Sequence, residues 1–256
     1  MTNAPAAARA LEVLGLLSRH TEPLPAAAIA RQLGLARSST YHLLAVLAEH
    51  GFVVHLPEER RYGLGVAAFE LGSAYSRQAP LQRLARPILT RLVDETRHNA
   101  HFAVLHGSDV LYLIEERAPR RPSLVTDVGV RLPAQLTASG LAMLAGLPAA
   151  QVRALYPSRD AFVQRQGSGP MSLAQLRSVL SGVRARGYAV EEGTVTADFS
   201  SVAAAVLDHG GHPVAAFALT FEGAGVDSAG RLRLAAAVSA SAAELSRRLG
   251  RGRSPG

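Results

Sequence analysis

Residues 25–49, with the sequence PAAAIARQLGLARSSTYHLLAVLAE, constrain the fold of this chain more than any other stretch. Mostly apolar side chains recur at positions i, i+3, i+4 and i+7 in each half, which is the spacing of a helix with one buried face. The recurring residues are Ala26, Ile29, Ala30 and Leu33 in the first half and Thr40, Leu43, Leu44 and Leu47 in the second. We therefore predict two short helices, joined by a turn at residues 34–36, that share one core.

The side of the second helix that faces away from this core carries small, polar and aromatic side chains that no core requires. These residues are Arg37, Ser38, Ser39, Tyr41 and His42. A second helix held outward in a helix-turn-helix fits the major groove of DNA, whereas the simpler interpretation is an ordinary solvated face. Arg37 is the strongest candidate for DNA contact, because its guanidinium can bond a guanine edge in bidentate fashion or clamp a phosphate.

The flanking segments complete a winged helix-turn-helix over residues 1–65. Residues 7–18 predict a third helix, and Pro25 fits the first position of the next helix, where its missing N–H costs nothing. Two short strands are predicted at 52–55 and 61–64, with a charged turn between them, and together they form a wing. Arg60 and Arg61 lie on this wing where they can reach phosphate, so we add them to the predicted DNA-binding residues.

The rest of the chain predicts a linker helix at 66–80, a second domain at 81–250 and a tail at 251–256. Helices are expected at 81–96, 137–145, 172–186 and 230–249, and strands at 100–105, 110–115, 188–192, 202–207 and 214–221. The elements alternate without the rhythm of parallel β-α-β units, which favours an α+β fold with an antiparallel sheet and a sensor-like second domain.

The composition excludes several classes of protein. A hydrophobic content of 48% is too high for a largely disordered chain, and no apolar run approaches the roughly 20 residues that cross a bilayer. The N-terminal residues lack the features of a secretory signal, so we expect a cytoplasmic location and no membrane partner. The absence of cysteine removes disulfides, thiolate metal sites and cysteine nucleophiles.

The net charge of +7 gives little support for DNA binding, because it lies in the wrong part of the chain. Residues 1–80 contain seven Arg and six acidic residues, a difference of +1, whereas residues 81–256 contain twenty and fourteen, a difference of +6. DNA binding must therefore depend on individually placed charges. This leaves open an alternative function, a metabolite-binding module or enzyme whose winged domain serves protein association only.

Catalytic and metal-binding motifs are incomplete. His98 and His101 are three residues apart and His106 follows, but no nearby acid or cysteine completes a metal shell, which favours structural histidines. The serines lack a Gly-x-Ser-x-Gly elbow, and no phosphate-binding loop follows a strand. We therefore expect no catalytic residue, no metal and no cofactor.

Two groups of short motifs give the chain a resemblance to a known family along nearly its whole length. The first group is LEVL at 11–14, ARQLGL at 30–35, ST-x-x-x-L at 39–44, L-x-x-x-GFV at 47–53 and RY-x-LG at 61–65. The second is RLP-x-x-x-TA-x-G at 131–140, RGYAV at 186–190 and SVAA-x-VLD at 201–208. In this order and spacing, the motifs resemble the IclR family of bacterial transcription regulators.

The resemblance implies a GAF-like effector-binding domain after the winged domain, in a ligand-responsive regulator. Our own expectation is a repressor rather than an activator. The resemblance also implies double-stranded operator DNA as a partner, assembly as a homodimer or dimer of dimers, and a small-molecule effector that is often an organic acid or aromatic compound. Carried over by position, it places the effector pocket at Leu113, Leu124, Gly129, Val130, Gln135, Glu191, Ser201, Ala218 and Thr220.

Departures from the family pattern bear on the ligand. Gln135 stands where the family often has His, and Leu141 stands where it usually has Lys. The loss of two cations favours a neutral or aromatic ligand, although helix N-terminal amides near Thr137 can still hold a carboxylate.

Overall fold

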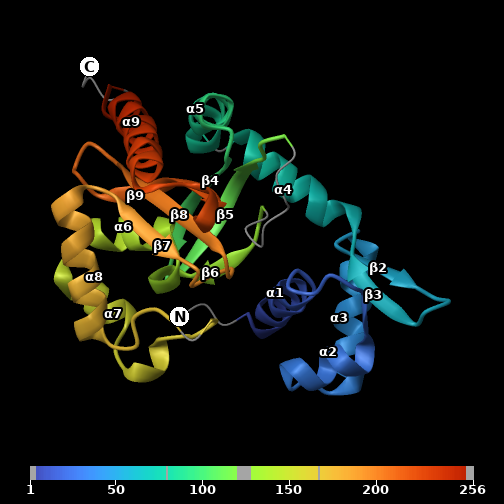
Figure 1. Cartoon of the computed structure of the whole chain (residues 1–256). Helices are drawn as coiled ribbons and strands as arrows, with labels where there is room; N and C mark the ends of the chain where they lie inside the picture. The colour runs from blue at the N-terminus through green and yellow to red at the C-terminus, as the bar shows by residue number, and fades with distance from the viewer. Residues whose placement is uncertain (1–3, 79, 120–127, 167, 252–256) are drawn as a thin grey trace. The chain divides into compact units, whose positions relative to one another are not determined.

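The computed structural model describes residues 4–78, 80–119, 128–166 and 168–251. The chain divides into two compact units, residues 1–80 and residues 81–256 (Figure 1). None of the helices in these described ranges is long and apolar enough to span a lipid bilayer.

The first unit is a three-helix core with a three-stranded sheet and a further helix. Its elements are α1 (Pro5–Leu17), β1 (Leu24–Pro25), α2 (Ala26–Leu33), α3 (Arg37–Glu49), β2 (Val53–Leu56), β3 (Arg61–Leu64) and α4 (Val66–Gln78). The predicted inner faces do form one core, in which Val13, Ile29 and Leu44 are fully buried. The winged helix-turn-helix is confirmed, with β2 and β3 as the wing and β1 paired to the outer side of β3.

Pro25 differs from its predicted position. It does not open α2 but precedes it as the N-cap residue, with an extended backbone (φ −69°, ψ 146°). In that conformation it pairs with Arg61 as the end of β1. Proline is tolerated there because an edge strand can leave the N–H side of a residue without a partner.

Glycines end both helices of the helix-turn-helix. Gly34 and Gly51 have left-handed backbones, with φ of 62° and 72°. The reversal lets Leu35 N–H reach the Ala30 carbonyl at 2.9 Å and Phe52 N–H reach the Leu47 carbonyl at 2.9 Å. Both are the closing bonds of a Schellman turn, which favours glycine because it has no Cβ to clash.

The second unit is built on one antiparallel sheet of six strands in the order β6-β5-β4-β9-β8-β7. The strands are β4 (Asn99–His106), β5 (Asp109–Glu116), β6 (Arg131–Pro133), β7 (Ala189–Glu192), β8 (Phe199–Leu207) and β9 (Pro213–Glu222). The helices are α5 (Pro80–Thr96), α6 (Ala138–Gly146), α7 (Ala149–Leu155), α8 (Leu173–Arg186) and α9 (Ser228–Arg251). The α+β prediction is confirmed, although α7 was not predicted, because seven residues are too short to show a helical period.

The two faces of this sheet are covered by different helices (Figure 1). One face packs large side chains such as Phe102 and Phe217 against α5 and α9. The other face has small side chains, including Ala103, Ala203 and Ala218, and packs against α6, with α8 outside it. Small side chains on this face allow α6 to lie close to the sheet.

Gly140 fixes where α6 begins. A Cβ at this position would lie 2.2 Å from the carbonyl oxygen of Ala134, in the short 3-10 helix Ala134–Leu136 that precedes α6. Such a contact is too short for any side chain, so glycine allows the two segments to pack together. This packing places the N-terminus of α6 against the small-residue face of the sheet.

Candidate functional site

The outward face of α3 is fully open, while its inner face is buried. Thr40, Leu44 and Leu47 point into the core. The five predicted DNA-binding residues of this helix, Arg37, Ser38, Ser39, Tyr41 and His42, are all exposed. Their contact with DNA stays a prediction, but their placement is the one that contact requires.

The start of α3 leaves further donors available. Its N-cap is Ala36, whose extended backbone begins the helix without a side-chain cap. The N–H groups of the first turn therefore have no partner within the helix and carry the positive end of its dipole. Backbone groups of this kind are suited to phosphate.

Arg9 of α1 borders the same surface, and the sequence did not point to it. A shallow groove runs beside the start of α3 and is lined by Arg9 together with Ser38, Ser39 and His42. Arg9 also pairs with Glu12 at 2.7 Å, and both side chains are about half exposed. Only the tertiary packing of α1 on α3 brings this guanidinium to the groove, so no local sequence signal could have found it.

The two wing arginines differ. Arg60 is exposed at the tip of the hairpin with a left-handed backbone, φ 54°. Arg61 points back into its own unit, where it donates to the Pro23 carbonyl at 3.0 Å and lies 3.8 Å from the Glu22 carboxylate. Of the two predictions, phosphate contact is therefore better supported for Arg60, and Arg61 has a structural use.

Aromatic side chains connect the wing to α3. His55 of β2 and Tyr62 of β3 are direct cross-strand partners, and their rings stack with centroids 4.6 Å apart. Partial burial raises the pKa of the Tyr62 phenol, and the neighbouring Tyr41 of α3 raises it further. The Tyr62 ring thus lies close enough to Tyr41 of α3 for the two phenols to interact electrostatically.

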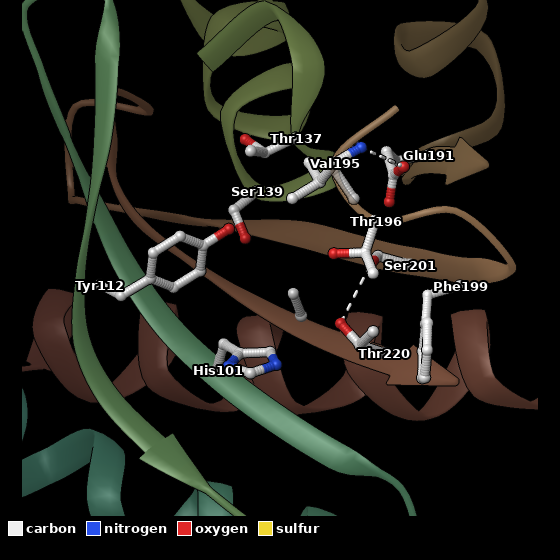
Figure 2. Close-up of a pocket in the computed structure, with 12 residues that line it drawn as sticks. His101, Tyr112, Thr137, Ser139, Glu191, Val195, Thr196, Phe199, Ser201 and Thr220 are labelled. Carbon is white, nitrogen blue, oxygen red and sulfur yellow. Dashed lines mark hydrogen bonds between the residues drawn. The ribbon is translucent and has the colours of Figure 1, made fainter. Parts of the chain in front are cut away.

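The second unit contains a cavity between the small-residue face of the sheet and the start of α6. It is lined by His101, Tyr112, Thr137, Ala138, Ser139, Glu191, Val195, Thr196, Phe199, Ser201, Ala218 and Thr220 (Figure 2). Its free volume is about 20 Å³, room for about one water molecule. A larger ligand therefore enters only if part of the wall moves.

Strand register assembles one wall of this cavity. Glu191 of β7 pairs with Ser201 of β8, and Ser201 pairs in turn with Thr220 of β9. Ala218, two residues before Thr220, pairs with His101 of β4. Because alternate residues of a strand share a face, all five side chains point to the same side of the sheet.

Glu191 holds the loop that follows β7. Its Oε1 accepts the N–H groups of Thr194 and Val195 at 2.6 and 3.2 Å and lies 2.8 Å from the Thr194 hydroxyl. That hydroxyl also reaches the Leu136 carbonyl at 2.6 Å, on the segment before α6. Burial raises the pKa of the Glu191 carboxyl, and these donors, with the Ser201 hydroxyl, limit the rise.

The opposite end of the cavity holds neutral polar groups (Figure 2). His101 is almost fully buried, and burial, assisted by the charge of Arg117, lowers its pKa to about 4. Burial also raises the pKa of the Tyr112 phenol, so both rings are uncharged at neutral pH. The two rings meet edge to face, with centroids 5.7 Å apart.

Four of the nine predicted effector residues line the cavity, namely Glu191, Ser201, Ala218 and Thr220. Leu113 packs against the other face of the sheet, next to a bulge in the β4–β5 pairing. Gly129 and Val130 hydrogen-bond the backbone of Tyr112, outside the lining. Leu124 lies outside the described residues.

Gln135 is placed differently from its prediction. It is buried, but its amide donates to the Val163 carbonyl at 3.0 Å and accepts from the Tyr156 hydroxyl at 3.4 Å. Leu141 is a core residue outside the lining as well. Because neither Gln135 nor Leu141 lines the cavity, the absence of His and Lys at these positions does not indicate the charge of the ligand. The prediction of a neutral or aromatic ligand is therefore not supported by these two residues.

Most of the cavity lies beyond prediction from the sequence. The sequence favours a structural role for His101 and has no motif that marks Tyr112 or Ser139. Alternate residues of a strand share a face, so the sequence of β8 and β9 can place Ser201 beside Ala203 and Ala218 beside Thr220. No local sequence signal shows that β4, β5 and α6 pack next to these residues. In the described parts of the chain, no three His, Asp or Glu side chains gather as a metal site.

Known proteins match this chain over nearly its whole length. Residues 6–57 match the IclR helix-turn-helix domain and residues 73–247 match the bacterial transcriptional regulator IclR C-terminal domain. The glycerol operon regulatory protein of Streptomyces coelicolor is 33% identical over 247 residues, 96% of each chain. The transcriptional repressor IclR of Escherichia coli K12 is 26% identical over 83% of this chain and 78% of its own. A crystal structure of an IclR homolog from Microbacterium hydrocarbonoxydans, complexed with 4-hydroxybenzoate, superimposes with a TM-score of 0.81 at 20% identity, covering 97% of this chain and 100% of that one.

Proposed function

The chain belongs to the IclR family of transcriptional regulators, and from this premise we propose that it represses transcription by binding operator DNA as a homodimer until a small organic effector binds. The observation that carries the proposal is the outward face of α3, whose Arg37 and His42 are exposed while Leu44 on the inner side of the helix is fully buried. A relative named as a repressor supports the sign of regulation. The chain would act in the cytoplasm and without catalysis.

In this proposal the start of α3 enters the major groove and the wing follows the backbone. Arg37 reads a guanine edge, because it stands in the first turn of the helix that faces outward. The N–H groups after Ala36, with Arg9 and Arg60, contact phosphate. Phosphate contacts fix the register of the protein on DNA, and base contacts supply sequence preference.

The small number of cations on each copy supports dimerisation. The first unit has a net charge of only +1, so one copy has few phosphate contacts to contribute. Val66 and Phe69, one helical turn apart on α4, are 68% and 74% exposed. We assign these apolar side chains to contact with a second copy, which would place two α3 helices on the two halves of a near-palindromic operator.

The cavity of the second unit is the proposed effector site. Because its free volume is about 20 Å³, a metabolite must displace part of the wall. The loop after β7, fixed through Glu191 and the Leu136 carbonyl, contacts both the cavity and the segment before α6. An effector can change DNA affinity only if it favours one arrangement over another, and DNA must then change effector affinity by the same factor.

A mobility-shift assay on DNA upstream of the gene and its neighbours tests the proposal. We expect retention that survives competitor DNA, and tighter retention on fragments with both half-sites than with one. Arg37→Ala should weaken specific binding by about 10- to 100-fold and nonspecific binding much less, since a bidentate base contact contributes about 1–3 kcal/mol.

Arg177→Ala is the matched control, because Arg177 is an exposed arginine of α8. It should leave the shift unchanged. Absence of selective retention over a range of salt concentrations would refute DNA regulation and favour the metabolite-binding alternative. Equal loss of specific and nonspecific binding in Arg37→Ala would reassign Arg37 to a phosphate.

A further inference from the structure

We propose that Gly51 and Gly65 form a rigid main-chain joint, which makes α3 and the start of α4 move as one body. The inference rests on the proposed function, in which α3 reads the operator and α4 contacts a second copy. Gly65 is then a positioning residue, because it fixes the direction in which α3 is presented relative to the contact between two copies.

Two main-chain hydrogen bonds close the joint. The N–H of Gly65 donates to the Phe52 carbonyl at 2.8 Å, and the N–H of Ala67 donates to the Gly51 carbonyl at 3.0 Å. Gly51 and Phe52 directly follow the end of α3, whose C-cap is His50, and Ala67 is the second residue of α4. The bonds therefore tie the end of α3 to the start of α4, although the whole wing hairpin lies between them in the sequence.

The two backbones cross so closely at Gly65 that no side chain fits there. A Cβ at this position would lie 2.1 Å from the Gly51 oxygen and 2.9 Å from the Gly51 carbonyl carbon. Gly51 itself has the left-handed backbone described above, which disfavours any side chain. Main chain therefore packs directly on main chain, and both glycines are needed for this contact.

This construction leaves the joint little freedom. Its hydrogen bonds and close contacts are made by backbone atoms, which have no side-chain rotamers to change. The segment is also held to α3 itself, because the Gly51 N–H donates to the Ala48 carbonyl at 3.0 Å and the Phe52 N–H to the Leu47 carbonyl at 2.9 Å. A change in the angle between α3 and α4 would have to break at least one of these bonds, so we expect the two helices to keep their angle.

The place of the joint on α4 matters for regulation. Val66 and Phe69, the exposed apolar residues assigned to contact with a second copy, lie on either side of Ala67 in the sequence. A change in the packing of two α4 helices would therefore turn both α3 helices with it, and alter the spacing and direction of the half-sites that they fit.

An effector would then act on the arrangement of the two copies and not on the inside of a winged unit. It changes operator affinity only as far as it favours one packing of the α4 helices over another. Each winged unit keeps the same internal structure in both arrangements, and this constancy can be measured.

Distance measurement by double electron–electron resonance on the full chain tests the rigidity directly. The chain has no cysteine, so Val46→Cys on α3 and Leu71→Cys on α4, both exposed, would be its only spin-labelled sites. An excess of unlabelled chain restricts the measurement to the distance within one copy. We expect one distance distribution, as narrow as that of a reference pair at Leu11 and Val46 across the helical core, and unchanged when operator DNA binds.

Gly65→Ala should displace or loosen the joint. Moving the two half-sites apart by one base pair rotates one against the other by about 35°. We expect the wild type to bind this wider operator about tenfold or more weakly, and Gly65→Ala to discriminate by less than about threefold. Affinity for a fragment with one half-site should change by less than about twofold, which a general loss of structure would not spare. Gly72→Ala, at a position on α4 where a Cβ would meet nothing within 4 Å, should keep the discrimination of the wild type.

Three results would overturn the inference: a broad distance distribution, a distribution that shifts when the operator binds, or unchanged spacing discrimination in a folded Gly65→Ala variant. If that variant does not fold, the distance measurement still decides. The distance measurement on the free chain needs no DNA, so it separates the two proposals. If the distribution is narrow and no operator is retained, the proposed function fails; if operator is retained and the distribution is broad, only the joint fails.

Discussion

The outward face of α3 and the cavity of the second unit are both polar, but they hold their polar groups in opposite ways. Arg37, Tyr41 and His42 are exposed. Glu191 and Thr137 are buried and hydrogen-bonded to the segments that carry them. A change on α3 should therefore alter binding alone, whereas a change in the cavity should alter binding and stability together.

The difference also predicts how each site responds to salt and pH. DNA contacts by exposed arginines release counterions, so their strength falls with added salt. Buried groups are screened much less, and their protonation is tied to folding.

The largest effect is expected for Gly140→Ala in α6. The new Cβ would lie 2.2 Å from the Ala134 carbonyl oxygen, and backbone on both sides must move to relieve the contact. We expect a loss of more than about 3 kcal/mol in the free energy of unfolding of the second unit, measured by urea denaturation.

Gly182→Ala in α8 is the control for this substitution. A Cβ at Gly182 would meet only the Arg186 side chain, at an ordinary 3.7 Å. It should therefore stabilise by up to about 1 kcal/mol through helix propensity. A loss below about 1 kcal/mol for Gly140→Ala would mean that α6 can move away from the segment before it, and the cavity would not depend on this packing.

The next largest effect is expected in the dependence of the unfolding free energy on pH. The pKa of His101 is lowered from 6.5 to about 4 in the folded state, mainly by burial. The folded chain thus binds fewer protons between these values, so stability is fully present above pH 6.5 and falls as the pH drops toward 4. The expected loss is about 3 kcal/mol. Glu191 opposes it, because its raised pKa makes its ionisation unfavourable to folding as the pH rises above 4.5.

His101→Gln isolates the histidine contribution. The difference in unfolding free energy between wild type and variant should change by about 3 kcal/mol between pH 6.5 and pH 4. The Glu191 contribution cancels in that difference as long as its surroundings are unchanged. A constant difference would show that His101 is solvated in solution, and the neutral end of the cavity would need revision.

The same contrast explains what could be predicted from the sequence. The outward face of α3 was predictable because a helix places residues three and four apart on one side, so His42 and Leu44, two residues apart, point to opposite sides by local spacing alone. The cavity depends on register between strands far apart in the chain, as in the pairing of His101 with Ala218. Resemblance supplied Glu191 and Ser201, but Ser139 required the position of α6 on the sheet.

Two predicted contact residues, one implied by the resemblance and one by the wing pattern, are hydrogen-bonded within the chain. Gln135 belongs to a family motif, yet its amide is used by Tyr156 and Val163. Arg61 stands on the wing, as predicted, but bonds the Pro23 carbonyl. In both cases the residue type fits a ligand contact, and only the tertiary structure shows the neighbouring carbonyl or hydroxyl that the side chain already bonds.

The smallest effect, in the wing, tests whether the division holds within a single unit. Arg61→Ala removes the bond to Pro23 and the long contact to Glu22, whose side chain is 83% exposed. The ion pair contributes little at that exposure, so the expected loss of stability is about 1 kcal/mol, mostly from the hydrogen bond. Arg60→Ala should leave the unfolding free energy unchanged and instead weaken DNA binding uniformly across sequences, with a smaller salt dependence. The contrary outcome is that Arg61→Ala reduces DNA binding as much as Arg60→Ala and causes no loss of stability. The Arg61 guanidinium would then leave the Pro23 carbonyl to bind phosphate, and the two wing arginines would not differ in role.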